Sequence, residues 1–167
     1  PMAGRLTIVG LGPADELLLT PQTSAAIADA TVVFLRTRRH PAASVLGDVQ
    51  SFDEIYDQAE TFEAVYQEIA ERLIAATGEG DVLYAVPGSP LVLERTVELL
   101  RVAADDGRLD LEILPAMSFL DAAWASLRID PVEEGVRLID GHRFAIAAAG
   151  QTGPLLVAHC HAAHVLS

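Results

Sequence analysis

The sequence contains no lysine, because all eleven of its basic residues are arginines. A phosphate-binding P-loop and a Schiff-base mechanism both need a lysine side chain, so both are excluded. Acidic residues outnumber basic ones by 24 to 11, which gives a formal net charge of −13 at pH 7. A surface of that sign repels phosphodiester backbones, so we expect no nucleic-acid partner.

Cysteine is equally scarce, with Cys160 as the single example. One thiol cannot form an internal disulfide, so we expect a reducing, cytoplasmic location. No apolar run reaches the roughly 18 residues that span a bilayer, and we expect no membrane partner. The marker patterns of serine hydrolases, Gly-x-Ser-x-Gly, and of zinc proteases, His-Glu-x-x-His, are also missing.

What the sequence does contain is an alternation of apolar strands and amphipathic helices. The predicted strands are 5–9, 31–35, 82–86, 109–114, 136–139 and 155–159, and the predicted helices are 21–28, 60–76, 91–104 and 118–126. Such alternation predicts an α/β fold with a mainly parallel sheet and flanking helices. The regular alternation of strands and helices ends after Asp130-Pro131. We therefore predict an N-terminal α/β subdomain over residues 4–115 and the start of a second, incomplete α/β subdomain over 116–167.

Three predicted strand-to-helix junctions share a design: Gly10-Leu-Gly-Pro13, Pro87-Gly-Ser-Pro90 and Pro115-Ala-Met-Ser118. The carboxyl ends of parallel strands lie at one edge of an open sheet, where ligands bind. Glycines let a ligand approach the backbone, and helix N-termini offer unpaired N–H groups. Each loop alone is explained equally well as a turn with a capping serine. Three at one edge predict a small-molecule site.

The first loop carries half of the dinucleotide fingerprint Gly-x-Gly-x-x-Gly. Asp15 stands where the third glycine belongs. Pro13 also interrupts the helix that should begin directly after Gly12. The sequence therefore excludes an NAD-type cofactor.

Several motifs in the order of the chain resemble the tetrapyrrole (corrin/porphyrin) methylase family, and within it the YabN-like N-terminal domain of MazG-fused proteins. They are Ile8-Val-Gly-Leu-Gly-Pro-Ala-Asp-Glu-Leu-Leu-Leu-Thr20, Leu35-Arg-Thr37 with His40-Pro41, Phe52-Asp-Glu-Ile-Tyr56, Tyr84-Ala-Val-Pro-Gly-Ser-Pro-Leu-Val92 and Ser118-Phe-Leu-Asp-Ala122. The resemblance runs from about residue 6 to the end of the chain. It implies an S-adenosylmethionine-dependent methyltransferase of two α/β subdomains with the cofactor in the cleft, acting on a small acceptor such as a tetrapyrrole.

The resemblance also implies which residues contact the cofactor. These are Gly12 and Pro13 in the first loop, Pro87, Gly88, Ser89, Leu91 and Val92 in the second, and Ser118 and Phe119 in the third. No side chain is indicated as a general base. Methyl transfer from a sulfonium needs little beyond holding donor and acceptor in line.

Two departures from the family keep a second hypothesis open. Ser89 stands where many active members carry aspartate, and family members continue for several more strands and helices. We therefore expect this chain to be a piece of a longer protein. The alternative function is a catalytically degenerate ligand-binding or dimerisation domain that regulates a fused or associated MazG-type nucleotide pyrophosphohydrolase. We expect a homodimer.

A basic stretch, Arg36-Thr-Arg-Arg-His40, interrupts this acidic chain. Arginine forks bind carboxylates, and tetrapyrrole precursors are polycarboxylates. Arg36, Arg38 and His40 are therefore candidate substrate-binding residues. The alternative is a solvated loop whose arginines pair with nearby acidic residues.

Two further patterns receive no functional assignment. The run His159-Cys-His-x-x-His164 suggests a metal site, but no second ligand cluster accompanies it, and we expect no metal. Acidic pairs on the predicted helix 60–76 recur opposite its apolar stripe. They are interpreted as a solvated face and not as the magnesium site of a pyrophosphohydrolase.

Overall fold

The computed structural model describes residues 4–58 and 61–160 of the chain. The chain divides into two compact units, Pro1–Asp121 and Ala122–Ser167. The sequence suggests a boundary after residue 115. Residues 116–121 fall in the first unit, where Ala116 packs against Gly10: a Cβ atom at Gly10 would lie 2.5 Å from Cβ of Ala116.

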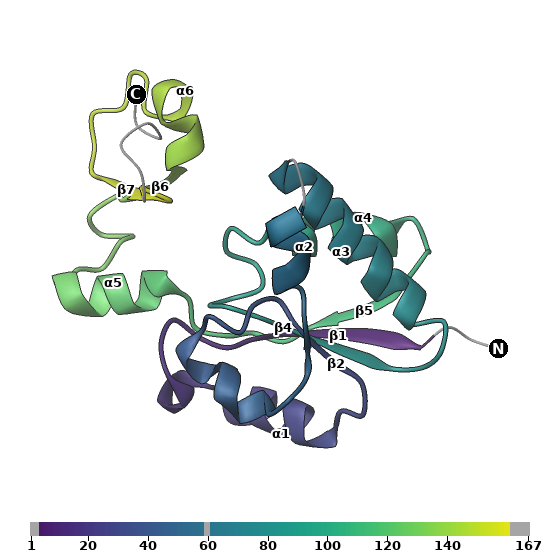
Figure 1. The fold of residues 1–167 in the computed structure, drawn as a ribbon. Coiled ribbons are helices and arrows are strands. Elements are labelled where there is room, and N and C mark those ends of the chain that lie inside the picture. The colour runs from purple at the N-terminus through teal and green to yellow at the C-terminus, as the bar shows by residue number, and fades with distance from the viewer. Residues whose placement is uncertain (1–3, 59–60, 161–167) are drawn as a thin grey trace. The chain divides into compact units, whose positions relative to one another are not determined.

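A five-stranded sheet with the order β3-β2-β4-β1-β5 forms the first unit (Figure 1). Its strands are β1 (Arg5–Gly10), β2 (Val33–Leu35), β3 (Gln50–Ser51), β4 (Val82–Val86) and β5 (Asp110–Ile113). All four pairings are parallel, as the alternation of elements predicts. The register places Gly10 opposite Val86 and Leu35 opposite Ala85, so neighbouring strands end at one edge.

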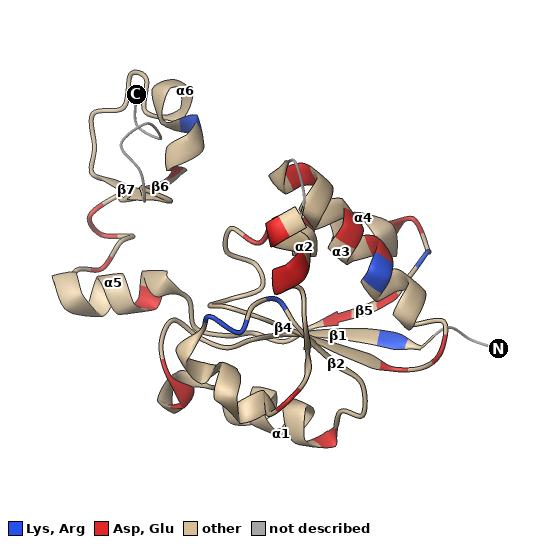
Figure 2. Cartoon of the chain, viewed as in Figure 1, with Lys and Arg blue, Asp and Glu red and all other residues tan. Residues whose placement is uncertain are grey.

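Helices cover both faces of this sheet. On one face lie α2 (Asp53–Gln58), α3 (Phe62–Ala76) and α4 (Arg95–Asp105), and on the other lies α1 (Pro21–Asp29) (Figure 1). Two 3-10 turns, η1 (Glu16–Leu18) and η2 (Pro41–Leu46), and the helix α5 (Phe119–Leu127) complete the elements that begin in this unit. The acidic residues are spread over most of these elements (Figure 2).

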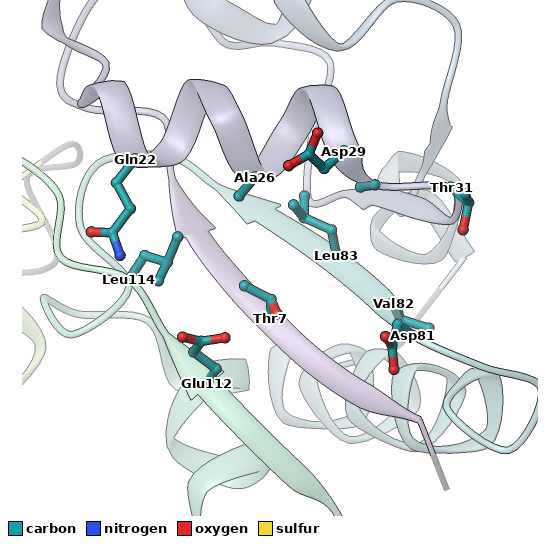
Figure 3. Close-up of a pocket in the computed structure, with 11 residues that line it drawn as sticks. Thr7, Gln22, Ala26, Asp29, Thr31, Asp81, Val82, Leu83, Glu112 and Leu114 are labelled. Atoms are coloured by element: carbon teal, nitrogen blue, oxygen red, sulfur yellow. The ribbon is translucent and has the colours of Figure 1, made fainter.

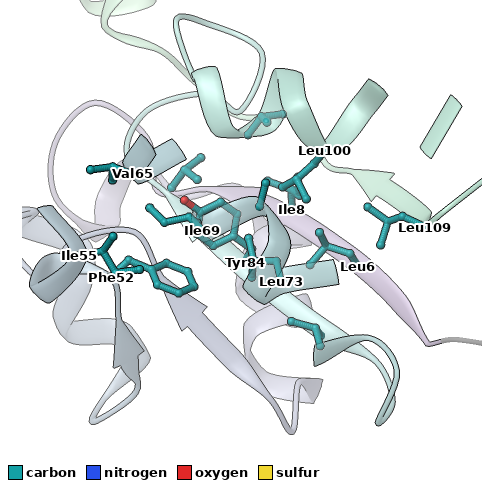
Figure 4. Close-up of a cluster of buried hydrophobic side chains, with 14 residues drawn as sticks. Leu6, Ile8, Phe52, Ile55, Val65, Ile69, Leu73, Tyr84, Leu100 and Leu109 are labelled. Carbon is teal, nitrogen blue, oxygen red and sulfur yellow. The ribbon is translucent and has the colours of Figure 1, made fainter. Parts of the chain in front are cut away.

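The burial of the central strand β4 explains why its sequence is apolar throughout. All five of its residues are buried. Val82, Tyr84 and Val86 pack in the cluster beneath α3 and α4 (Figure 4), whereas Leu83 and Ala85 pack in a second cluster toward α1. Full burial of one aliphatic side chain is worth about 1.5–3 kcal/mol, so these two clusters hold the layers together. A strand that is buried on both faces reads as a continuous apolar run.

Helix starts follow the sequence signals at two places. The Thr20 hydroxyl accepts from the Thr23 amide at 3.1 Å and opens α1, with Pro21 at its first position. At α5 the Asp121 carboxylate accepts from the Ser118 amide at 2.7 Å, while the Ser118 hydroxyl accepts from the Leu120 amide. The predicted capping box is confirmed there.

The predicted start of the fourth helix is wrong. The sequence predicts a helix from residue 91 with Ser89 as its cap, but α4 begins at Arg95 with Glu94 in the N-cap position. Leu93 has a φ of 58° and therefore lies in the left-handed region, which a right-handed helix cannot include. The loop between β4 and α4 is correspondingly longer. η2, β3 and α2 are not predicted from the sequence, because each is too short to show a period.

The second unit contains a two-stranded parallel sheet of β6 (Arg137–Asp140) and β7 (Leu155–Ala158). The 3-10 turn η3 (Gly141–Arg143) and the helix α6 (Phe144–Ala147) connect the strands. Within 122–160 only Ile139 and Gly141 are buried. No helix in the described parts of the chain is both long and apolar enough to cross a membrane.

Candidate functional site: three loops over Gly10

β1 and β4 are neighbours in the sheet, and their connections leave toward opposite faces. The connection that leaves β1 runs through α1 on one face, and the connection that leaves β4 runs through α4 on the other (Figure 1). Adjacent strands whose connections diverge in this way form a topological switch point. In open α/β sheets, ligands bind outside the carboxyl ends of the strands at such a point.

Two of the three loops, the ones that follow β1 and β4, are joined by main-chain hydrogen bonds. The Gly12 amide donates to the Gly88 carbonyl at 3.1 Å, and the Gly88 amide donates to the Gly12 carbonyl at 2.9 Å. Both glycines have positive φ angles, 73° and 64°, which few other residues adopt without strain. The first and second loops therefore form one backbone platform.

The third loop meets this platform at Gly10. A Cβ atom at Gly10 would lie 2.2 Å from the Gly88 carbonyl oxygen, 2.5 Å from Cβ of Ala116 and 2.9 Å from Cδ of Pro90. These contacts come from the second and third loops, so only a glycine fits beneath them. The predicted meeting of three loops at one edge is confirmed.

Asp15 has a local role that explains the break in the dinucleotide pattern. Its carboxylate accepts from the Leu17 amide at 3.1 Å and caps η1. The chain therefore makes a 3-10 turn after the first loop and enters α1 only at Pro21. The phosphate-facing helix start of a dinucleotide site is missing directly after Gly12.

The candidate cofactor residues differ in exposure around the platform. Gly12 and Ser118 are buried, whereas Leu91 and Phe119 are 62% and 40% exposed. The remaining candidates, Pro13, Pro87, Gly88, Ser89 and Val92, are partly exposed. A Cβ atom at Gly88 would have no heavy atom within 4 Å, so the platform is open at this position.

In the basic stretch after β2, Arg38 and His40 have partners within the first unit. Arg38 Nη2 contacts an Asp48 carboxylate oxygen at 3.2 Å. His40 Nδ1 accepts from the Ala42 amide, and its Nε2 donates to the Gly12 carbonyl at 3.0 Å. Burial lowers the pKa of His40 below its ordinary value. His40 is therefore a neutral imidazole near pH 7 and ties η2 to the first loop.

Arg36 forms a more buried pair that the sequence analysis did not anticipate. Its Nη1 lies 2.6 Å from Oε1 of Glu94, whose side chain is only 7% exposed. Its Nε donates to the Tyr56 hydroxyl at 3.1 Å. Burial raises the pKa of Glu94 to about 7 in spite of the Arg36 charge. No local pattern links two residues 58 positions apart, so only the sheet order reveals this pair.

An open cavity of the first unit lies away from the three loops. It has a volume of about 530 Å³ between α1 and the sheet, and Figure 3 shows its lining. Asp29, Asp81 and Glu112 contribute carboxylates to it. None of the candidate cofactor residues lines it, so this cavity carries no argument about the cofactor.

The histidine run at the end of the sequence lies only partly within the described residues. His161 and His164 fall outside them. His159 lies near Asp140 and His142, and the possible ligand atoms of these three side chains are within 4.8 Å of one another.

Comparisons with known proteins find a matching family and a relative. The profile of the family Tetrapyrrole (Corrin/Porphyrin) Methylases matches residues 5–154. The uncharacterized protein YabN of Bacillus subtilis (strain 168) is 40% identical over 143 residues, which cover 83% of this chain and 29% of YabN.

Solved structures show the same fold. Uroporphyrin-III-C-methyltransferase from Thermus thermophilus superposes with a TM-score of 0.67 at 24% identity, covering 87% of this chain and 64% of that one. A structure of a Thermus thermophilus uroporphyrin-III C-methyltransferase complexed with S-adenyl homocysteine gives a TM-score of 0.56 at 22% identity, covering 83% and 56%. The chain thus spans less than two thirds of these relatives.

Proposed function

The chain belongs to the tetrapyrrole (corrin/porphyrin) methylase family, and on that premise we propose that it is an S-adenosylmethionine-dependent methyltransferase domain that acts on a small acceptor. The observation that carries this proposal is the three-loop platform at the β1/β4 switch point. The neighbour from Thermus thermophilus that was solved with S-adenyl homocysteine supports the choice of cofactor.

The platform fits the cofactor in its chemistry. Its bridged glycines, Gly12 and Gly88, leave main-chain atoms close to an open surface. The half-exposed side chains of Leu91 and Phe119 offer apolar contacts beside it, which suit an adenine ring. The proposed cofactor residues remain Gly12, Pro13, Pro87, Gly88, Ser89, Leu91, Val92, Ser118 and Phe119.

S-adenosylmethionine, when bound, supplies an activated methyl group on a sulfonium. The contribution of this chain is positional: rigid loops hold the donor so that an acceptor atom can approach in line, which removes the entropic cost of a bimolecular encounter. His40 supports this rigidity because its hydrogen bond to the Gly12 carbonyl ties the first loop to η2.

For the acceptor we propose a carboxylate-bearing tetrapyrrole precursor, with Arg36, Arg38 and His40 on its side of the site. Arg36 and Arg38 are 28% and 49% exposed, so their guanidinium groups remain partly accessible beside Glu94 and Asp48. A carboxylate of the acceptor would share these arginines with their present partners.

Calorimetric titration with S-adenosylhomocysteine tests the proposed cofactor site. We expect one binding site per chain and its loss in Gly88→Trp, because the indole would fill the open side of the platform. Gly107→Trp is the matched control. Gly107 also has a positive φ, 75°, and open space at its Cβ, but it follows α4 at the opposite edge of the sheet.

If the Gly88→Trp variant still binds S-adenosylhomocysteine, the cofactor site does not lie at the platform. If Gly88→Trp and Gly107→Trp weaken binding equally, the loss is due to backbone strain at a positive φ and not to filling of the platform. Absence of binding by the wild-type chain would count against the methyltransferase proposal.

Ser89 favours a second candidate function, because it replaces the aspartate that many active family members carry. In that case the domain binds its ligand without turnover and regulates a MazG-type nucleotide pyrophosphohydrolase, in a homodimer. Addition of S-adenosylhomocysteine should then change the rate of the fused or associated pyrophosphohydrolase. An unchanged rate after deletion of this domain would contradict this alternative.

A further inference from the structure

Three potential metal ligands gather at one end of the small sheet in the second unit. The parallel register pairs Asp140 with Ala158, so His159 follows directly beside the end of β6. His142 lies two residues after Asp140 in η3. A cluster thus forms from two segments that are separated by the whole β6–β7 connection.

The possible ligand atoms of this cluster lie within 4.8 Å of one another, and Asp140 Oδ1 is hydrogen-bonded to both imidazoles, so one ion could contact all three side chains. Asp140 Oδ1 lies 2.9 Å from His142 Nδ1 and 3.2 Å from His159 Nδ1. Ligand atoms at about 2.0–2.1 Å from a tetrahedral zinc ion are about 3.3–3.4 Å apart, only slightly more than these separations. We propose that Asp140, His142 and His159 bind a divalent transition-metal ion, Zn²⁺ in the first place.

The donor set decides which class of metal suits the site. Two imidazole nitrogens and one carboxylate oxygen favour zinc, cobalt or nickel, whereas magnesium and calcium prefer oxygen ligands alone. Three protein ligands leave a fourth tetrahedral position for water. All three side chains are partly exposed, at 29% for Asp140, 54% for His142 and 41% for His159, so an ion has access from solvent.

The local backbone also points to this site. His159 has a φ of 60°, in the left-handed region that costs a non-glycine residue roughly 1–2 kcal/mol. This conformation turns the chain at the end of β7 and keeps the ring beside Asp140 and His142, whose ring it meets edge-on at 5.4 Å. Strain of this kind is found preferentially at functional positions.

The second unit also has a structural use for a metal ion. Among its described residues only Ile139 and Gly141 are buried, and a two-stranded sheet is marginally stable in water. An ion held by residues at the ends of both strands would link β6 to β7, and its binding free energy would add to the stability of this unit. The metal-binding proposal does not depend on the methyl-transfer proposal.

Cys160 is not part of the proposed ligand set. Its thiol contacts the carbonyl oxygens of Val157 and Ala158, at 3.4 and 3.7 Å. The site differs from the one that the sequence run suggests, because Asp140 comes from the end of β6 and His142 from η3.

Calorimetric titration of the whole chain with Zn²⁺ tests the proposal, together with the visible spectrum of the Co²⁺-loaded protein. We expect one ion per chain and a tetrahedral Co²⁺ spectrum without a sulfur charge-transfer band. Asp140→Asn, His142→Ala and His159→Ala should each weaken Zn²⁺ binding by at least about tenfold. Glu134→Gln is the matched carboxylate control in the same unit, where its exposed side chain should leave the affinity unchanged.

A His161→Ala/His164→Ala double variant distinguishes this cluster from the histidines that follow it. Retention of binding in the double variant supports the proposed ligands. Loss of binding only in the double variant, a sulfur band from Cys160, or the absence of stoichiometric binding by the wild type would each overturn the proposal. Circular dichroism of every variant separates lost ligands from lost folding.

Discussion

At the scale of single residues, the most unusual group is the Glu94 carboxylate. It is almost fully buried beside Arg36, yet burial raises its pKa from 4.5 to about 7. The folded chain therefore holds this proton more tightly than the unfolded chain does. The attraction of Arg36 does not offset the desolvation of a carboxylate, as is common for buried ion pairs.

This shift predicts a stability change with pH. Since the folded pKa is the higher one, the contribution of Glu94 to the free energy of unfolding is largest below pH 4.5 and falls as pH rises to about 7. A shift of this size corresponds to a loss on the order of 3 kcal/mol. Glu94→Gln should flatten this part of the pH profile, as measured by urea unfolding at several pH values.

The matched control for that profile is Glu98→Gln on the same helix. Its carboxylate is 60% exposed in an ion pair with Arg95, so its replacement should leave the slope between pH 4.5 and 7 as in the wild type. An unaltered slope in Glu94→Gln would show that another group is responsible.

At the scale of elements, the start of α4 shows where sequence reasoning reaches its limit. Apolar runs such as residues 82–86 predict strands well, because burial on both faces leaves no polar position. The segment before α4 has helix-compatible residues, and nothing in its composition reveals that Leu93 adopts a φ of 58°. The start of that loop, Gly88 to Pro90, contacts Gly10 and Gly12, which lie far away in the sequence.

The same limit applies to the candidate site. The three loops could be predicted because glycine and proline punctuate turns after apolar runs. The Arg36–Glu94 pair and the grouping of Asp140 with His159 depend on strand order and register, which no spacing in the sequence encodes. The short elements β3 and α2 were missed because they carry too few residues for a period to be visible.

The left-handed backbone of Leu93, in the loop before α4, leads us to expect that one substitution there stabilises the fold. Leu93→Gly should raise the free energy of unfolding by up to about 1 kcal/mol, because glycine removes the left-handed strain and Leu93 is 42% exposed. Chemical denaturation measures the effect. Leu91→Gly, on the same loop but without a positive φ, should bring no gain, and equal effects of both variants would contradict the explanation.

At the scale of the whole molecule, the net charge of −13 bears on the choice of ligand. S-adenosylmethionine carries a sulfonium charge that S-adenosylhomocysteine lacks. A negative field attracts the cationic cofactor over distances comparable with the Debye length, which is about 10 Å at 0.1 M salt.

We therefore expect added salt to weaken binding of S-adenosylmethionine more than binding of S-adenosylhomocysteine. Calorimetric titrations at about 0.05 M and about 0.5 M sodium chloride would measure the difference, since the Debye length falls severalfold across this range. Equal salt dependence of the two ligands would show that the net charge of the chain has no part in cofactor selection.

The main-chain pairing of Gly12 with Gly88 has an evolutionary consequence. Both hydrogen bonds join backbone atoms, so they place no demand on the side chains of Pro13 and Ser89 next to them. On the proposed function, substitutions at those neighbouring positions would change the contacts with the ligand while the backbone pairing of the two loops persists.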